Sequence, residues 1–94
     1  MTFPCISIRR HDVGIYEWFV LYESADVDSQ AGETSIQECL VTAAAGLPDE
    51  ERVVEVKYRG VHMGSFSKIE LLENSSEVAD KIAQQYGAIL EQIS

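Results

Sequence analysis

Two histidines are the side chains of this chain best suited to act as a general base, and neither has the neighbours that catalysis needs. A nucleophile must be activated by an adjacent base, which a third group orients. His11 is followed by Asp12 and, two positions on, by Gly14, as in a solvated turn, whereas His62 lies in a stretch typical of a strand. We therefore expect no catalytic residues, and the sequence favours a protein that is not an enzyme.

The two cysteines, Cys5 and Cys39, are far apart in the sequence, and neither has a second thiol nearby. Redox pairs and thiolate zinc sites need closely spaced cysteines. A metal site that joined Cys5 to His62 and Glu55 would need ligands from non-adjacent edges of the predicted sheet. We predict two reduced thiols, no metal site and no cofactor, with Cys39 on the apolar side of a helix.

Aromatic side chains are concentrated in the stretch Ile15 to Glu23. The two-residue period of a strand puts Tyr16, Trp18 and Tyr22 on one side of it, and the same parity argument adds three residues from later strands. Aromatic residues and arginine are enriched in the cores of protein interfaces. The sequence therefore predicts an interface or ligand-binding face made of Tyr16, Trp18, Tyr22, Arg59, His62 and Phe66.

Length and charge limit the classes of partner. A chain of 94 residues, 46% of them hydrophobic and 24% charged, has material for one domain spanning 1–94. Its formal net charge of −9 disfavours nucleic acid and anionic membranes, and would attract a basic protein. The first ten residues do not resemble a signal peptide, and no apolar run is long enough to span a bilayer. These features predict a cytoplasmic protein.

Hydrophobic periodicity predicts the secondary structure. Strands are expected over 3–9 and 15–23, followed by a solvated loop over 24–31. Ser35 and Glu38 form a capping-box pattern that starts a helix, which Gly46 and Pro48 end. Further strands are expected over 52–59 and 61–72, joined by a turn at Gly60. A last helix is expected from Asn74 nearly to the end of the chain.

The order ββαββα predicts an α+β fold. Moving the fourth strand of a ferredoxin-like fold to its front gives this order. The expected architecture has two layers, with a four-stranded, mainly antiparallel sheet of order 1-2-4-3 and two helices on one face. A strongly curled sheet built from two ββα units is the alternative. In the two-layer arrangement the face that carries Trp18 would have no cover.

Two functions are compatible with these features. The first is a small acidic, non-catalytic binding or assembly protein that acts as a homodimer through the aromatic face of the sheet. The second is a small-molecule-binding domain or small enzyme, with a pocket near Trp18, Tyr22, His62 and Phe66. A flat face would favour the first function, and an enclosed cavity would favour the second.

Overall fold

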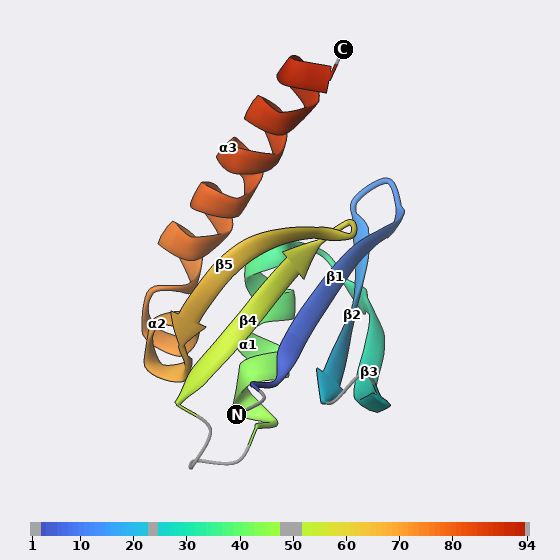
Figure 1. Cartoon of the computed structure of the whole chain (residues 1–94). Coiled ribbons are helices and arrows are strands. Elements are labelled where there is room, and N and C mark those ends of the chain that lie inside the picture. The colour runs from blue at the N-terminus through green and yellow to red at the C-terminus, as the bar shows by residue number, and fades with distance from the viewer. Residues whose placement is uncertain (1–2, 23–24, 48–51, 94) are drawn as a thin grey trace.

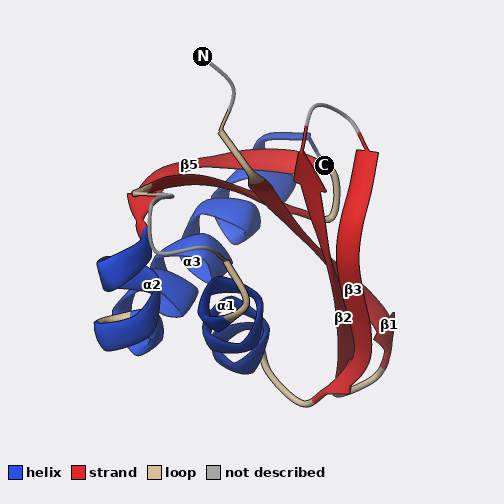
Figure 2. Cartoon of the chain, turned by 90° about the horizontal axis from the view of Figure 1, so that it is seen from below, coloured by secondary structure: helices blue, strands red, loops and turns tan. Residues whose placement is uncertain are grey.

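The computed structural model describes residues 3–22, 25–47 and 52–93. In these residues the fold is α+β, with a five-stranded mixed sheet and helices packed on one side of it (Figures 1 and 2). The elements in chain order are β1 (Cys5–Asp12), β2 (Ile15–Tyr22), β3 (Ala25–Glu33), α1 (Ile36–Ala45), β4 (Val53–Tyr58), β5 (Val61–Ser67), α2 (Lys68–Glu73) and α3 (Ser75–Ile93).

The sheet order is β3-β2-β1-β4-β5, so the predicted four-stranded order 1-2-4-3 is wrong. β1, β2 and β3 form an antiparallel meander, and β4 and β5 form an antiparallel hairpin. The two units join where β4 lies parallel to β1, after the crossover through α1. The permuted ferredoxin-like arrangement is replaced by this mixed sheet, in which β1 and not β2 is central.

The residues expected to form a loop over 24–31 belong largely to β3, an edge strand. An edge strand uses the backbone groups of one side only and has little apolar surface to bury, so its sequence lacks the pattern of a buried strand. Asp28 and Gly32 are typical of loops, but such residues also protect a sheet edge from pairing with other chains.

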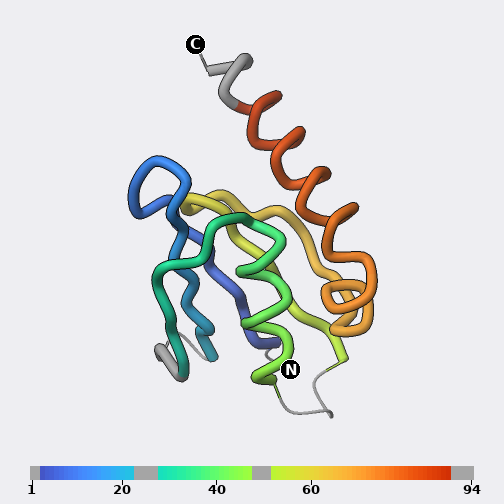
Figure 3. The backbone as a smooth tube through the Cα atoms, turned by 180° about the vertical axis from the view of Figure 1, so that it is seen from behind, coloured from blue at the N-terminus to red at the C-terminus, as the bar shows by residue number. Residues whose placement is uncertain are grey.

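The core lies between the sheet and the helices. The residues that β1 and β4 point toward the helices are fully buried, as predicted for Ile6, Ile8, Val54 and Val56. Cys39 and Leu40 of α1, Leu71 of α2 and Ile82 of α3 close the core from the other side. α1 packs against the sheet with α3 beside it, as Figure 3 shows from behind.

Two serine caps determine where helices begin. Ser35 accepts a hydrogen bond from the backbone N–H of Glu38 at 3.1 Å, as its pattern predicts, and Gly46 caps the other end of α1. The predicted capping box is only half formed, because the carboxylate of Glu38 accepts from the backbone N–H of Thr34 and not from that of Ser35. Pro48 lies outside the described residues. Ser67 and Glu70 form a complete capping box that ends β5 and starts α2. The strand predicted over 61–72 is therefore too long.

α3 extends beyond the body of the fold at its C-terminal end (Figure 1). Its first half packs into the core through Val78 and Ile82. Farther along, the ring of Tyr86 meets that of Tyr58 edge-on, with centroids 5.0 Å apart. No helix within the described residues combines the length and apolar content that a membrane span requires.

Candidate functional site

The predicted aromatic face is not a single surface. Trp18 is only 2% exposed and lies in the core with Phe66, while Tyr16 is half-buried against the same core. Their predicted position on the uncovered side of the sheet is wrong. Apolar side chains point to both sides of β2, so the alternation of its sequence alone does not determine which side faces the helices. The larger indole of Trp18 fills the core, and Phe19 and Leu21 lie on the other side.

The remaining predicted site residues lie at the surface. Tyr22, at the end of β2, is 37% exposed, and His62 is exposed on β5. Arg59 is exposed in the turn between β4 and β5. The predicted pocket near Trp18, Tyr22, His62 and Phe66 therefore does not form as a shared cavity, because two of these residues are in the core and two are outside it.

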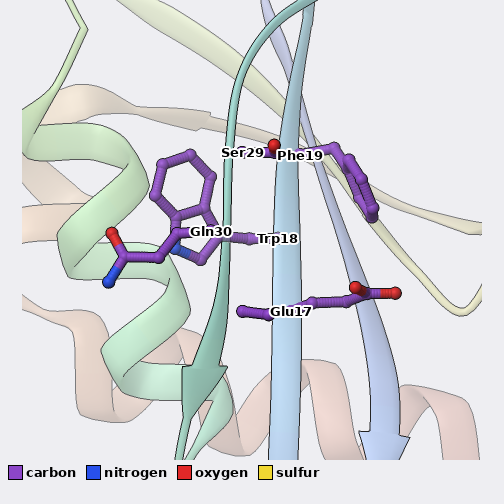
Figure 4. A pocket seen from close by; sticks show the side chains of 6 residues that line it. Glu17, Trp18, Phe19, Ser29 and Gln30 are labelled. Carbon is purple, nitrogen blue, oxygen red and sulfur yellow. The ribbon is translucent and has the colours of Figure 1, made fainter.

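Trp18 does border a hollow of about 250 Å³ beside the edge strand β3. Figure 4 shows Trp18 and Gln30 on the side of α1, and Glu17, Phe19 and Ser29 pointing the other way. The indole Nε1 of Trp18 is buried without a hydrogen-bond partner. Since the lining side chains emerge on both sides of the sheet, this hollow does not enclose a ligand, and a single water could satisfy the indole.

The side of the sheet away from the helices is the candidate interface, which we call the open face. Its members follow from strand register, because directly paired residues point to the same side. Ser7 lies between Phe19 and Lys57, and Cys5 lies between Leu21 and Glu55. The described residues of the open face include Cys5, Ser7, Arg9, Glu17, Phe19, Leu21, Ser29, Ala31, Glu55, Lys57, His62 and Ser65.

The centre of the open face is apolar and its surroundings are charged. Cys5 is only 8% exposed although the register places it on the side of the sheet away from the helices, and Phe19 and Leu21 are half-buried. The guanidinium of Arg9 lies over the ring of Phe19, 5.0 Å from its centroid. Glu17 lies opposite Arg9 in the register, and its carboxylate is 4.0 Å from Nδ1 of His11. The face therefore combines an apolar centre with charges of both signs.

Comparison with known proteins found no family model, curated protein or solved structure that matches this chain. Among the described residues, no group of three or more His, Cys, Asp or Glu side chains is arranged to hold a metal ion. The functional argument therefore depends on the geometry of the chain itself.

Both thiols are held in their neutral form. Burial, reinforced by the nearby Glu33 and Glu38, raises the pKa of Cys39 to about 12. Burial also raises the pKa of Cys5, an effect that Lys57 opposes and Glu55 reinforces. A protonated thiol is a poor nucleophile and a poor metal ligand. These environments are those of packed side chains and not of reactive cysteines.

We expect the buried thiol of Cys39 to make the fold less stable in alkali. Its pKa rises from 9.0 to about 12 on folding, so its stabilising effect is complete below pH 9. Above that pH the unfolded thiol ionises first and stability falls, by about 2 kcal/mol near pH ~10.5. Urea unfolding at several pH values measures this loss. Cys39→Ala should show a shallower decline, and equal slopes for the two proteins would contradict the assignment.

Proposed function

We propose that this chain is a non-catalytic assembly protein that forms a homodimer through the open face. The observation that carries the proposal is the apolar centre formed by Cys5, Phe19 and Leu21 on the side of the sheet that the helices leave uncovered. Burying these side chains against an equivalent surface would remove apolar area from water, which favours association. The paired strands β1 and β2 present them together.

Charge balance favours a second copy of the chain as the occupant. In β1, β2 and β4 the open face carries two acids, Glu17 and Glu55, and two bases, Arg9 and Lys57, so this central part of it is formally neutral. The chain as a whole carries −9. Two copies that meet through this face therefore bring together their least repulsive surfaces. A basic protein partner would instead be attracted to the acidic surfaces elsewhere.

The spacing of Glu55 and Lys57 also supports a two-fold interface. They are two residues apart in β4 and point to the same side. In a homodimer with two-fold symmetry, each contact occurs twice, with the partners exchanged. A two-fold axis that crosses β4 near residue 56 would place Glu55 of each copy against Lys57 of the other. The same face can thus complement itself without any other chain.

Sedimentation velocity tests this proposal. We expect the unmodified chain to sediment as a dimer of 10.5 kDa subunits at about 100 µM. Phe19→Glu should weaken the dimer about thirtyfold or more, because it places a charge at the apolar centre. Since Phe19 is half-buried outside the helix-covered core, this variant should keep the circular dichroism of the native fold.

Val13→Glu is the matched control. Val13 is 79% exposed in the turn between β1 and β2, away from the apolar centre of the open face, and the substitution changes the charge by the same amount. We expect it to leave the dimer unchanged. A monomeric unmodified chain at about 100 µM, or equal weakening by the two substitutions, would overturn the proposal.

A further inference from the structure

The outer edge of β5 is a row of backbone groups that the described fold leaves without partners. β5 is the last strand in the sheet order and pairs with β4 alone. Among the described residues, no group outside β4 forms a hydrogen bond with the backbone of residues 61–66. A strand edge of this kind can pair with a further strand.

The register of β4 and β5 shows which backbone groups point outward. Opposite residues of an antiparallel pair alternate between pairs that exchange hydrogen bonds and pairs that exchange none. The backbone N–H of Lys68 donates to the carbonyl of Arg52 at 3.1 Å, which makes these two residues a bonded pair. Counted from this pair along the register, Glu55 and Ser65 are a pair that exchanges none. The backbone N–H and C=O of Ser65 therefore point away from β4.

The turn at the other end of β5 identifies a second outward residue. Its two central residues have φ of 53° and 84°, as in a type I′ turn. The bonded pair that closes such a turn is Tyr58 and Val61, so the backbone groups of the next residue, His62, point outward. An irregularity of the register leaves Met63 as an extra, buried residue. His62 and Ser65 consequently lie opposite residues two apart in β4, which is the spacing that an added strand requires.

The two edges of the sheet differ in their protection against an incoming strand. Charged side chains on an edge strand oppose strand addition. β3 carries Asp28 and Glu33 among its described side chains, whereas β5 alone of the five described strands has no Asp, Glu, Lys or Arg. Gly64 also leaves the middle of the β5 edge without a side chain, as is typical where another backbone approaches closely. β5 is therefore the edge open to a further strand.

The charges beside this edge favour a basic partner. α2 follows β5 directly, and α3 lies on the helix side of β5 (Figure 2), where the amine of Lys81 is 5.9 Å from the ring centroid of Phe66. From Lys68 to Lys81 these helices carry two lysines and four exposed carboxylates, those of Glu70, Glu73, Glu77 and Asp80. The net charge of −9 attracts a basic partner at longer range, whereas a second copy would bring the same negative charge.

We propose that β5 binds an extended basic segment of a partner protein, which pairs with its outer edge as an added strand. Backbone hydrogen bonds at His62 and Ser65 would supply affinity, and alternate basic side chains of the segment would point to the side of the acidic helices. The outward backbone groups lie along the plane of the sheet and do not point out of the open face. This site therefore does not depend on the homodimer.

Amide hydrogen exchange measured by NMR tests the proposal on the full chain. The probe is a blocked octapeptide that alternates lysine with valine. We expect saturable binding with a Kd below about 1 mM in ~100 mM NaCl. At saturation the backbone N–H groups of His62 and Ser65 should exchange about tenfold more slowly or less, while the amides of β3 keep their rates. No saturable change up to about 10 mM peptide, or slower exchange in β3 instead, would overturn the proposal.

Two further peptides separate strand addition from general attraction. A copy of the lysine peptide that is N-methylated at every residue keeps the charges but has no backbone donors, so it should not bind. A peptide that alternates glutamate with valine should bind at least about tenfold more weakly. Equal binding of the methylated peptide would overturn strand addition, and equal binding of the glutamate peptide would overturn the basic partner. Slow exchange at His62 and Ser65 without any peptide would assign the edge to a second copy and overturn the proposed occupant.

Ser65→Pro tests the assigned direction of the backbone donor, with Ser65→Ala as the matched control. Proline is tolerated on an edge strand where its nitrogen faces solvent, so the variant should keep the circular dichroism of the native fold. Its affinity for the lysine peptide should fall about tenfold or more, because one backbone donor is lost. Ser65→Ala loses the same hydroxyl but keeps the N–H, and should bind like the unmodified chain. Equal affinities of the two variants would contradict the assignment.

Discussion

Trp18→Ala is expected to lower the free energy of unfolding by about 3 to 5 kcal/mol, as removal of a large buried aromatic side chain does. The indole of Trp18 is 2% exposed and belongs to the core between the sheet and the helices. A domain of this size has a total stability of roughly 5 to 15 kcal/mol, so the variant should be close to unfolding at room temperature. Urea unfolding followed by circular dichroism measures the loss.

Tyr22→Ala provides the comparison, since the sequence places Tyr22 and Trp18 on the same side of β2 and only their burial differs. Tyr22 is 37% exposed at the end of the strand, so its loss should cost less than about 1.5 kcal/mol. A Trp18→Ala variant as stable as Tyr22→Ala would show that Trp18 is not part of the core. It would also restore the sequence-based hypothesis that Trp18 contributes to an interface.

Reversal of one charge in β4 is expected to have the second large effect. If Glu55 of each copy meets Lys57 of the other, Lys57→Glu places four carboxylates together at this two-fold contact. Like charges brought together in an interface cost several kcal/mol, so the dimer should dissociate at micromolar concentrations. Glu55→Lys should also dissociate the dimer, because it places positively charged lysines against one another at the same contact. Native mass spectrometry measures the fraction of dimer for each variant.

Two combinations distinguish a specific contact from general disruption. A mixture of Lys57→Glu and Glu55→Lys chains should form a heterodimer, because each variant provides the complement of the other. A chain with both substitutions should again form a homodimer, because the pairs are restored with exchanged signs. If both single variants remain fully dimeric, the face or its two-fold register is wrong.

Much of the core could be predicted from the sequence because its pattern was unambiguous. In β1 and β4, apolar Ile6, Ile8, Val54 and Val56 alternate with polar or small residues, and the structure confirms their burial. The start of α1 at Ser35 was predicted from a local hydrogen-bonding pattern, which does not depend on distant contacts. Local patterns of this kind predict strand sides and helix starts without knowledge of the tertiary contacts.

The sheet topology could not be obtained in the same way. The pairing of β1 with β4 is parallel and joins residues about fifty positions apart, as Cys5 and Glu55 show. No turn residue marks such a pairing, whereas Gly14 and Gly60 mark the two hairpins. The loop predicted from composition over 24–31 was wrong at β3, because the residue types that protect an exposed edge are those that also favour a loop.

The candidate site was only partly accessible from sequence. Arg59 and His62 are exposed, but Arg59 lies in a turn instead of on the predicted sheet face, and Trp18 was assigned to the wrong side of β2. The available signal was weak, since Glu17 alternates with Trp18 and marks the polar side of an otherwise apolar strand.

The most direct test of the proposed homodimer is an isotope-filtered NOE measurement. It uses an equal mixture of carbon-13-labelled and unlabelled chains, and it detects only contacts between two copies. The open-face dimer predicts cross-peaks between the ring of Phe19 in one copy and the methyl groups of Leu21 in the other. A spectrum without intermolecular cross-peaks, or with cross-peaks only from residues of α3 or β5, would contradict it.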